Sequence, residues 1–95
     1  MNDLLFKFDG ETLKIRKSTY QNNGASAVFV ECEDGEPYAI LSCNLEAKPA
    51  NGCFWLKDWS ENEPIAKALL KSGVIELTGR AVSSGFVLVK EARFR

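Results

Sequence analysis

Three carboxylates lie close together in the middle of the chain: Asp58, Glu61 and Glu63. Paired carboxylates act as general acid and base, or hold a metal, when burial or mutual repulsion shifts their pKa values. Acidic residues at a helix N-terminus also stabilise the helix dipole, without any chemistry. Because Ser60 and Glu63 have the spacing of a capping box, we interpret the cluster as a helix start.

The other side chains that commonly carry catalysis are scarce. The chain has no histidine, which removes Ser-His-Asp and Cys-His constellations and every histidine-based metal site. Cys32, Cys43 and Cys53 form no Cys-x-x-Cys pair, and we expect them to be reduced thiols that fill the core. No glycine-rich phosphate loop is present. The sequence therefore predicts a protein that is not an enzyme, with no catalytic residue, no metal ligand and no cofactor.

A second group of residues is suited to binding rather than to chemistry. Tyr38, Trp55 and Trp59 are aromatic, and Arg80 follows a glycine. Such side chains anchor protein interfaces, and aromatic rings also stack on bases or flat ligands. The structural alternatives are core aromatics and, for Arg80, an ion pair with the acidic helix start. We take Tyr38, Trp55, Trp59 and Arg80 as the candidate partner-binding residues.

Composition narrows the class of partner. The chain has 95 residues, 45% of them hydrophobic and 26% charged, as expected of one domain spanning residues 1–95. A net charge of −1 argues against nucleic acid, which requires a basic field. No apolar run reaches the roughly 18 residues of a membrane helix, and Met1–Lys7 has no basic signal-peptide region. We therefore expect a cytoplasmic protein without a membrane partner.

The N-terminal half has the pattern of an antiparallel meander. Turn signals separate stretches of alternating apolar residues at three places: Asp9-Gly10, Asn23-Gly24 and Asp34-Gly35. Counting outward from the first turn places Leu4 opposite Ile15 and Phe6 opposite Leu13. These four side chains then share one apolar face.

The second and third turns extend this meander. The second places Arg16 opposite Glu31, as an opposite-charge pair. The third places Phe29 opposite Ile40 and Glu31 opposite Tyr38. Because Phe29, Tyr38 and Ile40 make the second face partly apolar, we expect it to be covered by the helix, by the C-terminal strand or by a partner.

The C-terminal half adds one helix. A loop over residues 46–52 precedes a short aromatic strand at 53–57, and the helix pattern runs from about Glu61 to Ser72. Its start is either the Ser60 capping box or a cap at Asn62 or Glu63, since Pro64 has no N–H to donate. We then expect an extended segment at 74–78, a turn at Gly79-Arg80 and a final strand at 86–94. The predicted fold is α+β: a curved antiparallel meander of five to six strands packed with one helix.

The same half resembles a family of small uncharacterised proteins carried by phages, prophages, plasmids and conjugative elements. The residues that carry the resemblance are Lys57, Trp59-Ser60-Glu61-Asn62-Glu63, Gly79-Arg80, Val82 and Ser84-Gly85-Phe86-Val87. Members commonly have glycine where this chain has Pro64. The resemblance implies an accessory protein of a mobile element that acts inside a bacterium, and it carries over no functional residues.

These observations predict a non-enzymatic protein that docks on a host or phage protein. One such activity is inhibition of a bacterial defence system such as CRISPR-Cas. The alternatives are a binding protein for a small ligand or nucleotide signal, with a pocket lined by aromatic side chains and arginine or lysine, and a structural accessory protein.

Overall fold

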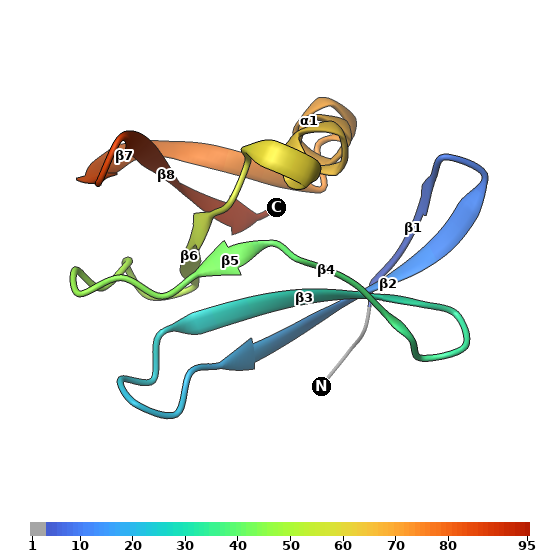
Figure 1. The fold of residues 1–95 in the computed structure, drawn as a ribbon, viewed down its shortest axis with the longest axis horizontal. Helices are drawn as coiled ribbons and strands as arrows, with labels where there is room; N and C mark the ends of the chain where they lie inside the picture. Colours follow the sequence, from blue (N-terminus) through green and yellow to red (C-terminus); the bar gives the residue numbers. More distant parts are fainter. Residues whose placement is uncertain (1–3) are drawn as a thin grey trace.

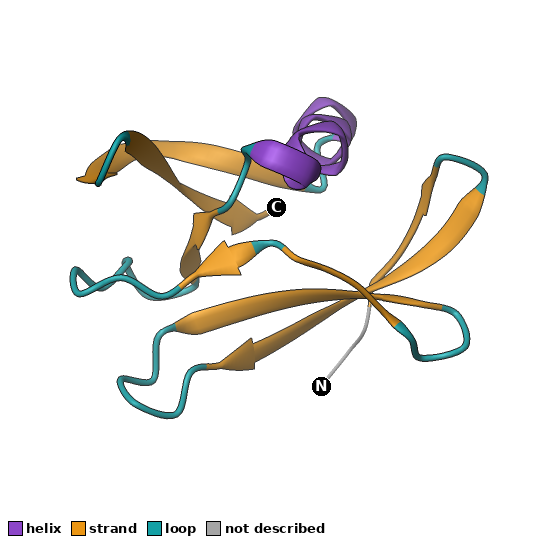
Figure 2. Cartoon of the chain, viewed as in Figure 1, coloured by secondary structure: helices purple, strands orange, loops and turns teal. Residues whose placement is uncertain are grey.

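The chain folds into two four-stranded antiparallel sheets and one α-helix in the computed structural model, which describes residues 4–95 (Figures 1 and 2). The first three residues of the N-terminal segment considered above lie outside the described residues. One sheet contains, in spatial order, β1 (Leu4–Phe8), β2 (Glu11–Thr19), β3 (Ser26–Cys32) and β4 (Pro37–Ile40). The other contains β5 (Ser42–Cys43), β6 (Cys53–Leu56), β8 (Val87–Phe94) and β7 (Ile75–Ser84). A 3-10 turn, η1 (Ser60–Asn62), leads into α1 (Glu63–Ser72).

The predicted α+β class is confirmed, with two sheets in place of one curved meander. Only Leu41 separates β4 from β5. Its N–H donates to the Val28 carbonyl at 3.0 Å, and its carbonyl accepts from the Lys57 N–H at 2.7 Å. One residue therefore bonds with β3 of the first sheet and with the residue after β6 of the second, and the chain bends from the first sheet into the second at this point.

The first hairpin has the predicted register, whereas the second is shifted by two residues. Arg16 pairs with Phe29 rather than with Glu31. The turn closes between Tyr20 and Ala25, where the Tyr20 N–H donates to the Ala25 carbonyl at 2.8 Å, so four residues form the loop instead of two. An even shift leaves every side chain on its predicted face. Arg16 still reaches Glu31 diagonally, with 3.4 Å between Nη1 and Oε1.

The third hairpin keeps its predicted pair of Phe29 and Ile40 but contains a β-bulge. Glu31 pairs with Pro37, so the predicted partner Tyr38 is the extra residue. The Cys32 N–H donates to the Glu36 carbonyl at 2.8 Å, which gives the turn three residues rather than two. One additional residue in the turn shifts the pairing by one, and the bulge restores the register.

The capping-box prediction for Ser60 is wrong, and the alternative cap at Asn62 is correct. Ser60 lies in the left-handed region with φ 60°, and Asn62 precedes the first residue of α1. The Asn62 side chain is buried and makes no cap hydrogen bond. Its amide donates instead to the Ile40 carbonyl at 2.6 Å and to the Lys57 carbonyl at 3.2 Å. Pro64 stands in the first turn of α1, where no intrahelical N–H bond is needed.

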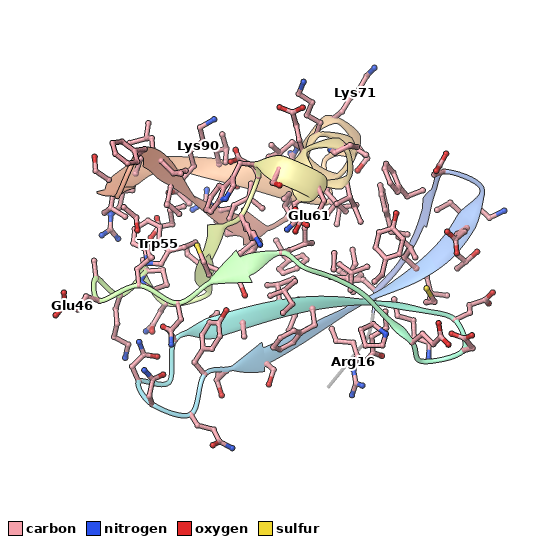
Figure 3. All side chains as sticks on the ribbon, in the orientation of Figure 1. Arg16, Glu46, Trp55, Glu61, Lys71 and Lys90 are labelled. Atoms are coloured by element: carbon pink, nitrogen blue, oxygen red, sulfur yellow. The ribbon has the colours of Figure 1, made fainter. Side chains whose placement is uncertain are left out.

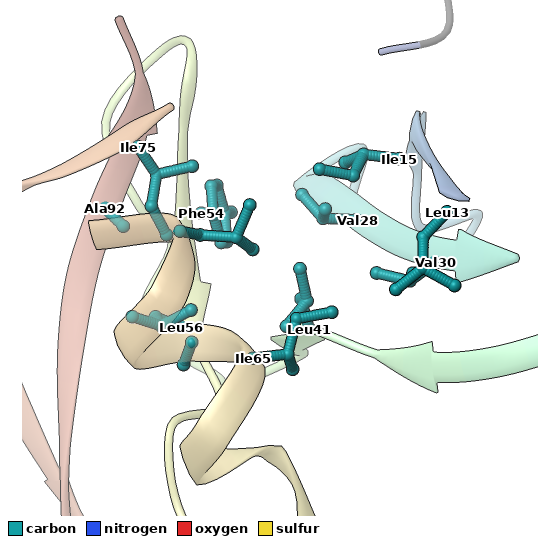
Figure 4. Close-up of a cluster of buried hydrophobic side chains, with 12 residues drawn as sticks. Leu13, Ile15, Val28, Val30, Leu41, Phe54, Leu56, Ile65, Ile75 and Ala92 are labelled. Atoms are coloured by element: carbon teal, nitrogen blue, oxygen red, sulfur yellow. The ribbon is translucent and has the colours of Figure 1, made fainter. Parts of the chain in front are cut away.

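Both sheets and the helix contribute to one core, which Figure 4 shows at close range. Its buried members are Leu13, Ile15, Val28, Val30, Leu41, Phe54, Leu56, Ile65, Ala66, Leu69, Ile75 and Ala92. The helix contacts β7, and its buried side chains share this core with Val28 and Val30 on one face of the first sheet. The opposite face, which carries Ile40 at 53% exposure, is not covered by the helix or by β8. Within residues 4–95, no helix is long and apolar enough to cross a membrane.

The helix start yields a test that separates the two capping schemes. Replacing Asn62 with Ala removes two hydrogen bonds to carbonyls at a buried site, and we expect the free energy of unfolding to fall by about 1–3 kcal/mol. Replacing Ser60 with Gly relieves a left-handed backbone and should raise it by up to about 1 kcal/mol. Urea denaturation of both variants measures the difference. A loss of stability in Ser60→Gly with none in Asn62→Ala would restore the capping box.

Candidate functional site

A bulge in β7 concentrates polar side chains on one point of β8. The pairing of the two strands shifts between Leu77 and Ala81, so residues 78–80 lie opposite Glu91 alone. Gly79 takes φ 100°, a conformation that glycine adopts without strain. The turn predicted at Gly79-Arg80 is therefore wrong, because β7 continues through this segment to Ser84.

Glu91 is the centre of the resulting cluster. It is 1% exposed, and its carboxylate accepts hydrogen bonds on both oxygens. The Thr78 hydroxyl donates to Oε1, while Arg80 Nη1 and the Ala50 N–H donate to Oε2 at 3.0 and 2.9 Å. The Arg80 guanidinium carbon also lies 5.8 Å from the centroid of the Trp55 ring, within the range of a cation–π contact.

The loop between β5 and β6, residues 44–52, closes over this cluster. Trp55 and Glu91 are cross-strand partners on the face of the second sheet that points away from the core. The Trp55 indole N–H donates to the Ala47 carbonyl of the loop at 2.7 Å. The Ala50 N–H of the same loop donates to the Glu91 carboxylate. Figure 3 shows Trp55 beside this loop. The predicted loop is therefore held to the sheet at two positions.

The environment of Glu91 keeps the carboxylate charged. Burial alone would raise its pKa, but the hydrogen bonds from Thr78 and Ala50 and the positive charges of Arg80 and Arg93 outweigh burial, and the pKa is lowered. A general acid or base instead needs a pKa near the working pH. The geometry therefore assigns Glu91 to stability rather than to proton transfer.

The four candidate partner-binding residues lie at different places in the fold. Trp55 is 1% exposed, so its ring is not presented at the surface. Arg80 has a 55% exposed side chain, but it pairs with Glu91 instead of the acidic helix start. Trp59 is half-buried at the entry to η1, and Tyr38 is 38% exposed on β4 of the other sheet. The structure thus brings Trp55 and Arg80 together and leaves Tyr38 and Trp59 on separate elements.

The acidic cluster proposed from the sequence is divided among separate partners. Asp58 Oδ2 lies 3.5 Å from the Lys90 ammonium, and Glu61 Oε1 lies 3.6 Å from the Lys57 ammonium. A hydrogen bond from the Ser60 side chain, with smaller contributions from the backbone and Lys57, lowers the pKa of Glu61. In the described part of the chain, no three Cys, Asp or Glu residues are placed to hold a metal ion.

The three cysteines are poor candidates for nucleophiles. All three are free thiols, and Cys53 is buried while Cys32 and Cys43 are half-buried. Burial is the main cause that raises the pKa of each thiol, and nearby carboxylates add to it. A raised pKa lowers the fraction of reactive thiolate at neutral pH.

Sequence reasoning missed an exposed apolar tip on the β7–β8 hairpin. Ser84 pairs with Val87, so Gly85 and Phe86 form a two-residue turn. Phe86 is fully exposed and Leu88 is 56% exposed; we call these two residues the apolar tip. The only sequence signal is a phenylalanine directly after the turn glycine, and the strand predicted at 86–94 includes it.

Comparisons of the chain with protein-family models, with curated proteins and with solved structures found no match. The function therefore has to be inferred from the exposed side chains and the ion pairs of the protein itself. The Glu91 cluster holds a loop to a sheet, and the apolar tip exposes an aromatic ring.

The Glu91 cluster makes stability depend on pH. At neutral pH we expect Glu91→Gln to lower the free energy of unfolding by about 1–3 kcal/mol, because charge-assisted hydrogen bonds are lost at a buried site. Since the native pKa lies below the ordinary 4.5, this contribution is complete above that pH and disappears as the pH falls through the native pKa. The gap between wild type and variant should therefore narrow in acid.

Urea denaturation at several pH values between neutrality and acid measures this gap. Glu46→Gln, at an exposed position of the same loop, is the matched control and should behave like the wild type throughout. A gap that stays constant with pH would show that Glu91 does not carry the linkage.

Proposed function

We propose that this protein is a non-enzymatic binding protein that acts by contact with another protein. The observation that carries the proposal is the apolar tip, where Phe86 is fully exposed and Leu88 is 56% exposed. Burying such an exposed aromatic ring in a partner's pocket makes the free energy of binding more favourable. Buried aromatic rings contribute a large share of the binding energy at protein interfaces. The partner that fits is a protein with an apolar pocket able to accept one aromatic side chain.

The base of the hairpin supports this role. β7 and β8 pair over most of their length, and the Thr78 and Arg80 bonds to Glu91 tie the bulged strand to its neighbour. A turn of only two residues leaves the tip little conformational freedom. Contacts presented by an ordered element cost less entropy on binding, which favours affinity.

The biological setting of the proposal follows from the resemblance of the Trp59–Glu63 segment and of the residues near the tip. On this proposal the protein is the product of a phage or mobile element, acts in the bacterial cytoplasm and has a host or phage protein as its partner. Inhibition of a host defence system such as CRISPR-Cas is the activity we propose for it. Within this proposal Tyr38 and Trp59 are further contact residues, and Trp55 and Arg80 support the hairpin.

The apolar tip can be tested with a double substitution. We expect Phe86→Ser with Leu88→Ser to lower partner affinity at least about tenfold without unfolding the protein, because neither side chain belongs to the core. The tagged protein is cross-linked in a phage-infected bacterial host, the captured protein is identified and purified, and its affinity is measured by calorimetry.

The matched control is Leu5→Ser, which removes an exposed apolar side chain from β1, the edge strand of the other sheet that lies farthest from Tyr38. It should bind like the wild type, and circular dichroism and thermal unfolding should show that both variants are folded. Equal affinity of the wild type and the double variant would reject the tip as the contact. Failure to capture any protein specifically would reject the binding function.

A further inference from the structure

A cavity of about 260 Å³ opens between the two sheets. The lining comes from both sheets. From the first sheet come Lys17, Ser18, Ser26, Ala27 and Val28. From the second come Phe54 and Phe94, together with Gly52, the residue before β6. Lys17 and Val28 are cross-strand partners, and Ser26 lies two residues from Val28, so these three point to the same side of the first sheet. The cavity is therefore built by strands from both halves of the chain.

The lining combines one cation with two aromatic rings. The Lys17 ammonium lies 4.4 Å from the centroid of the Phe94 ring, and the centroids of Phe94 and Phe54 are 5.6 Å apart. Among the residues described, Lys17 forms no ion pair, and no carboxylate lines the cavity. The ammonium is thus held against an aromatic ring beside an open space, without an anionic partner.

Two other cavities lack this combination. One, near the turns of the first sheet, is lined by Glu11, Glu33 and Asp34 and contains no cation. Another lies against the loop between β5 and β6 and is lined by Glu46 with no aromatic ring. Carboxylates in these linings would repel an anion. Of these three cavities, the Lys17 cavity therefore has the lining suited to an anion.

We propose that the cavity between the sheets binds a small aromatic anion. The ring of the ligand would pack against Phe94 and Phe54, and its carboxylate or phosphate would pair with the Lys17 ammonium and accept a hydrogen bond from the Ser26 hydroxyl. The volume equals that of roughly nine water molecules, which sets the ligand at about ten non-hydrogen atoms. This site is separate from the apolar tip and does not depend on the proposed protein contact.

The probes are benzoate, phenyl phosphate and the neutral benzamide, each titrated into the isotope-labelled full chain and followed by two-dimensional NMR. We expect saturable shifts at the backbone amides of Lys17, Ser26 and Phe94 with both anions. Benzamide should bind at least about tenfold more weakly, because it lacks the charge that pairs with Lys17. The tighter of the two anions distinguishes a carboxylate ligand from a phosphate ester.

Two variants separate the charge from the space. Lys17→Met should weaken the anions at least about tenfold and leave benzamide unchanged, while Ser26→Leu should fill the cavity and weaken all three probes. Lys67→Met, at an exposed position on α1, is the matched control and should bind like the wild type. The double variant of the apolar tip should also retain anion binding.

Three results would overturn the proposal. They are the absence of saturable shifts up to about 10 mM probe, equal affinity of wild type and Lys17→Met for the anions, and shifts that map to surface lysines elsewhere. Thermal unfolding of each variant shows whether it is folded, so a weakened Lys17→Met with an unchanged melting temperature supports a direct contact.

Discussion

The fold depends on the backbone of Leu41, which pairs with strands of both sheets. Its N–H bonds to Val28 of β3 and its carbonyl to the N–H of Lys57, the residue after β6. A chain that bends inside a core has to satisfy the polar groups of its backbone, because an unpaired buried amide is costly. In Leu41 the N–H and the carbonyl are both paired, each with a different segment. The Leu41 side chain is fully buried in the core that lies inside the bend.

The elements around this bend are secured by polar side chains that reach across it. The Ser42 hydroxyl accepts from the Val28 N–H at 2.9 Å and bonds with the Tyr20 hydroxyl at 2.8 Å. The Asn62 amide joins the end of β4 to the residue after β6. Each of these groups is buried or half-buried and paired, so the junction combines an apolar interior with a complete set of hydrogen bonds.

The second sheet carries both the buried Glu91 cluster and the exposed apolar tip, at different places. On the face away from the core, Glu91 and Trp55 hold the covering loop. The charged carboxylate contributes through its three hydrogen-bond partners, Thr78, Arg80 and Ala50, rather than through proton transfer. At the turn between β7 and β8, the apolar tip has no such cover. The cavity at Lys17 lies instead between the sheets, so the two proposed binding regions can be altered independently.

Much of the local structure was predictable from residue patterns. The Asp9-Gly10 hairpin has its predicted register, and Gly73 ends the helix with φ 84°. Of the candidate residues, Trp55 and Arg80 do meet, but the partner they share, Glu91, had no signal in the sequence because a buried carboxylate looks like any charged residue in a strand. The sequence pattern predicts Phe86 as part of a strand, whereas its exposure follows from its position in the two-residue turn between Ser84 and Val87.

The sequence by itself determined the α+β class, the alternation of faces along each strand and the end of the helix, because these follow from periodicity and from glycine conformation within a few residues. Tertiary structure decided the rest. The loop from Gln21 to Gly24, the two bulges and the role of Asn62 depend on hydrogen bonds between distant segments, and the bend at Leu41 exists only because two separate sheets meet there. A local pattern cannot encode the position of a partner that arrives from elsewhere in the chain.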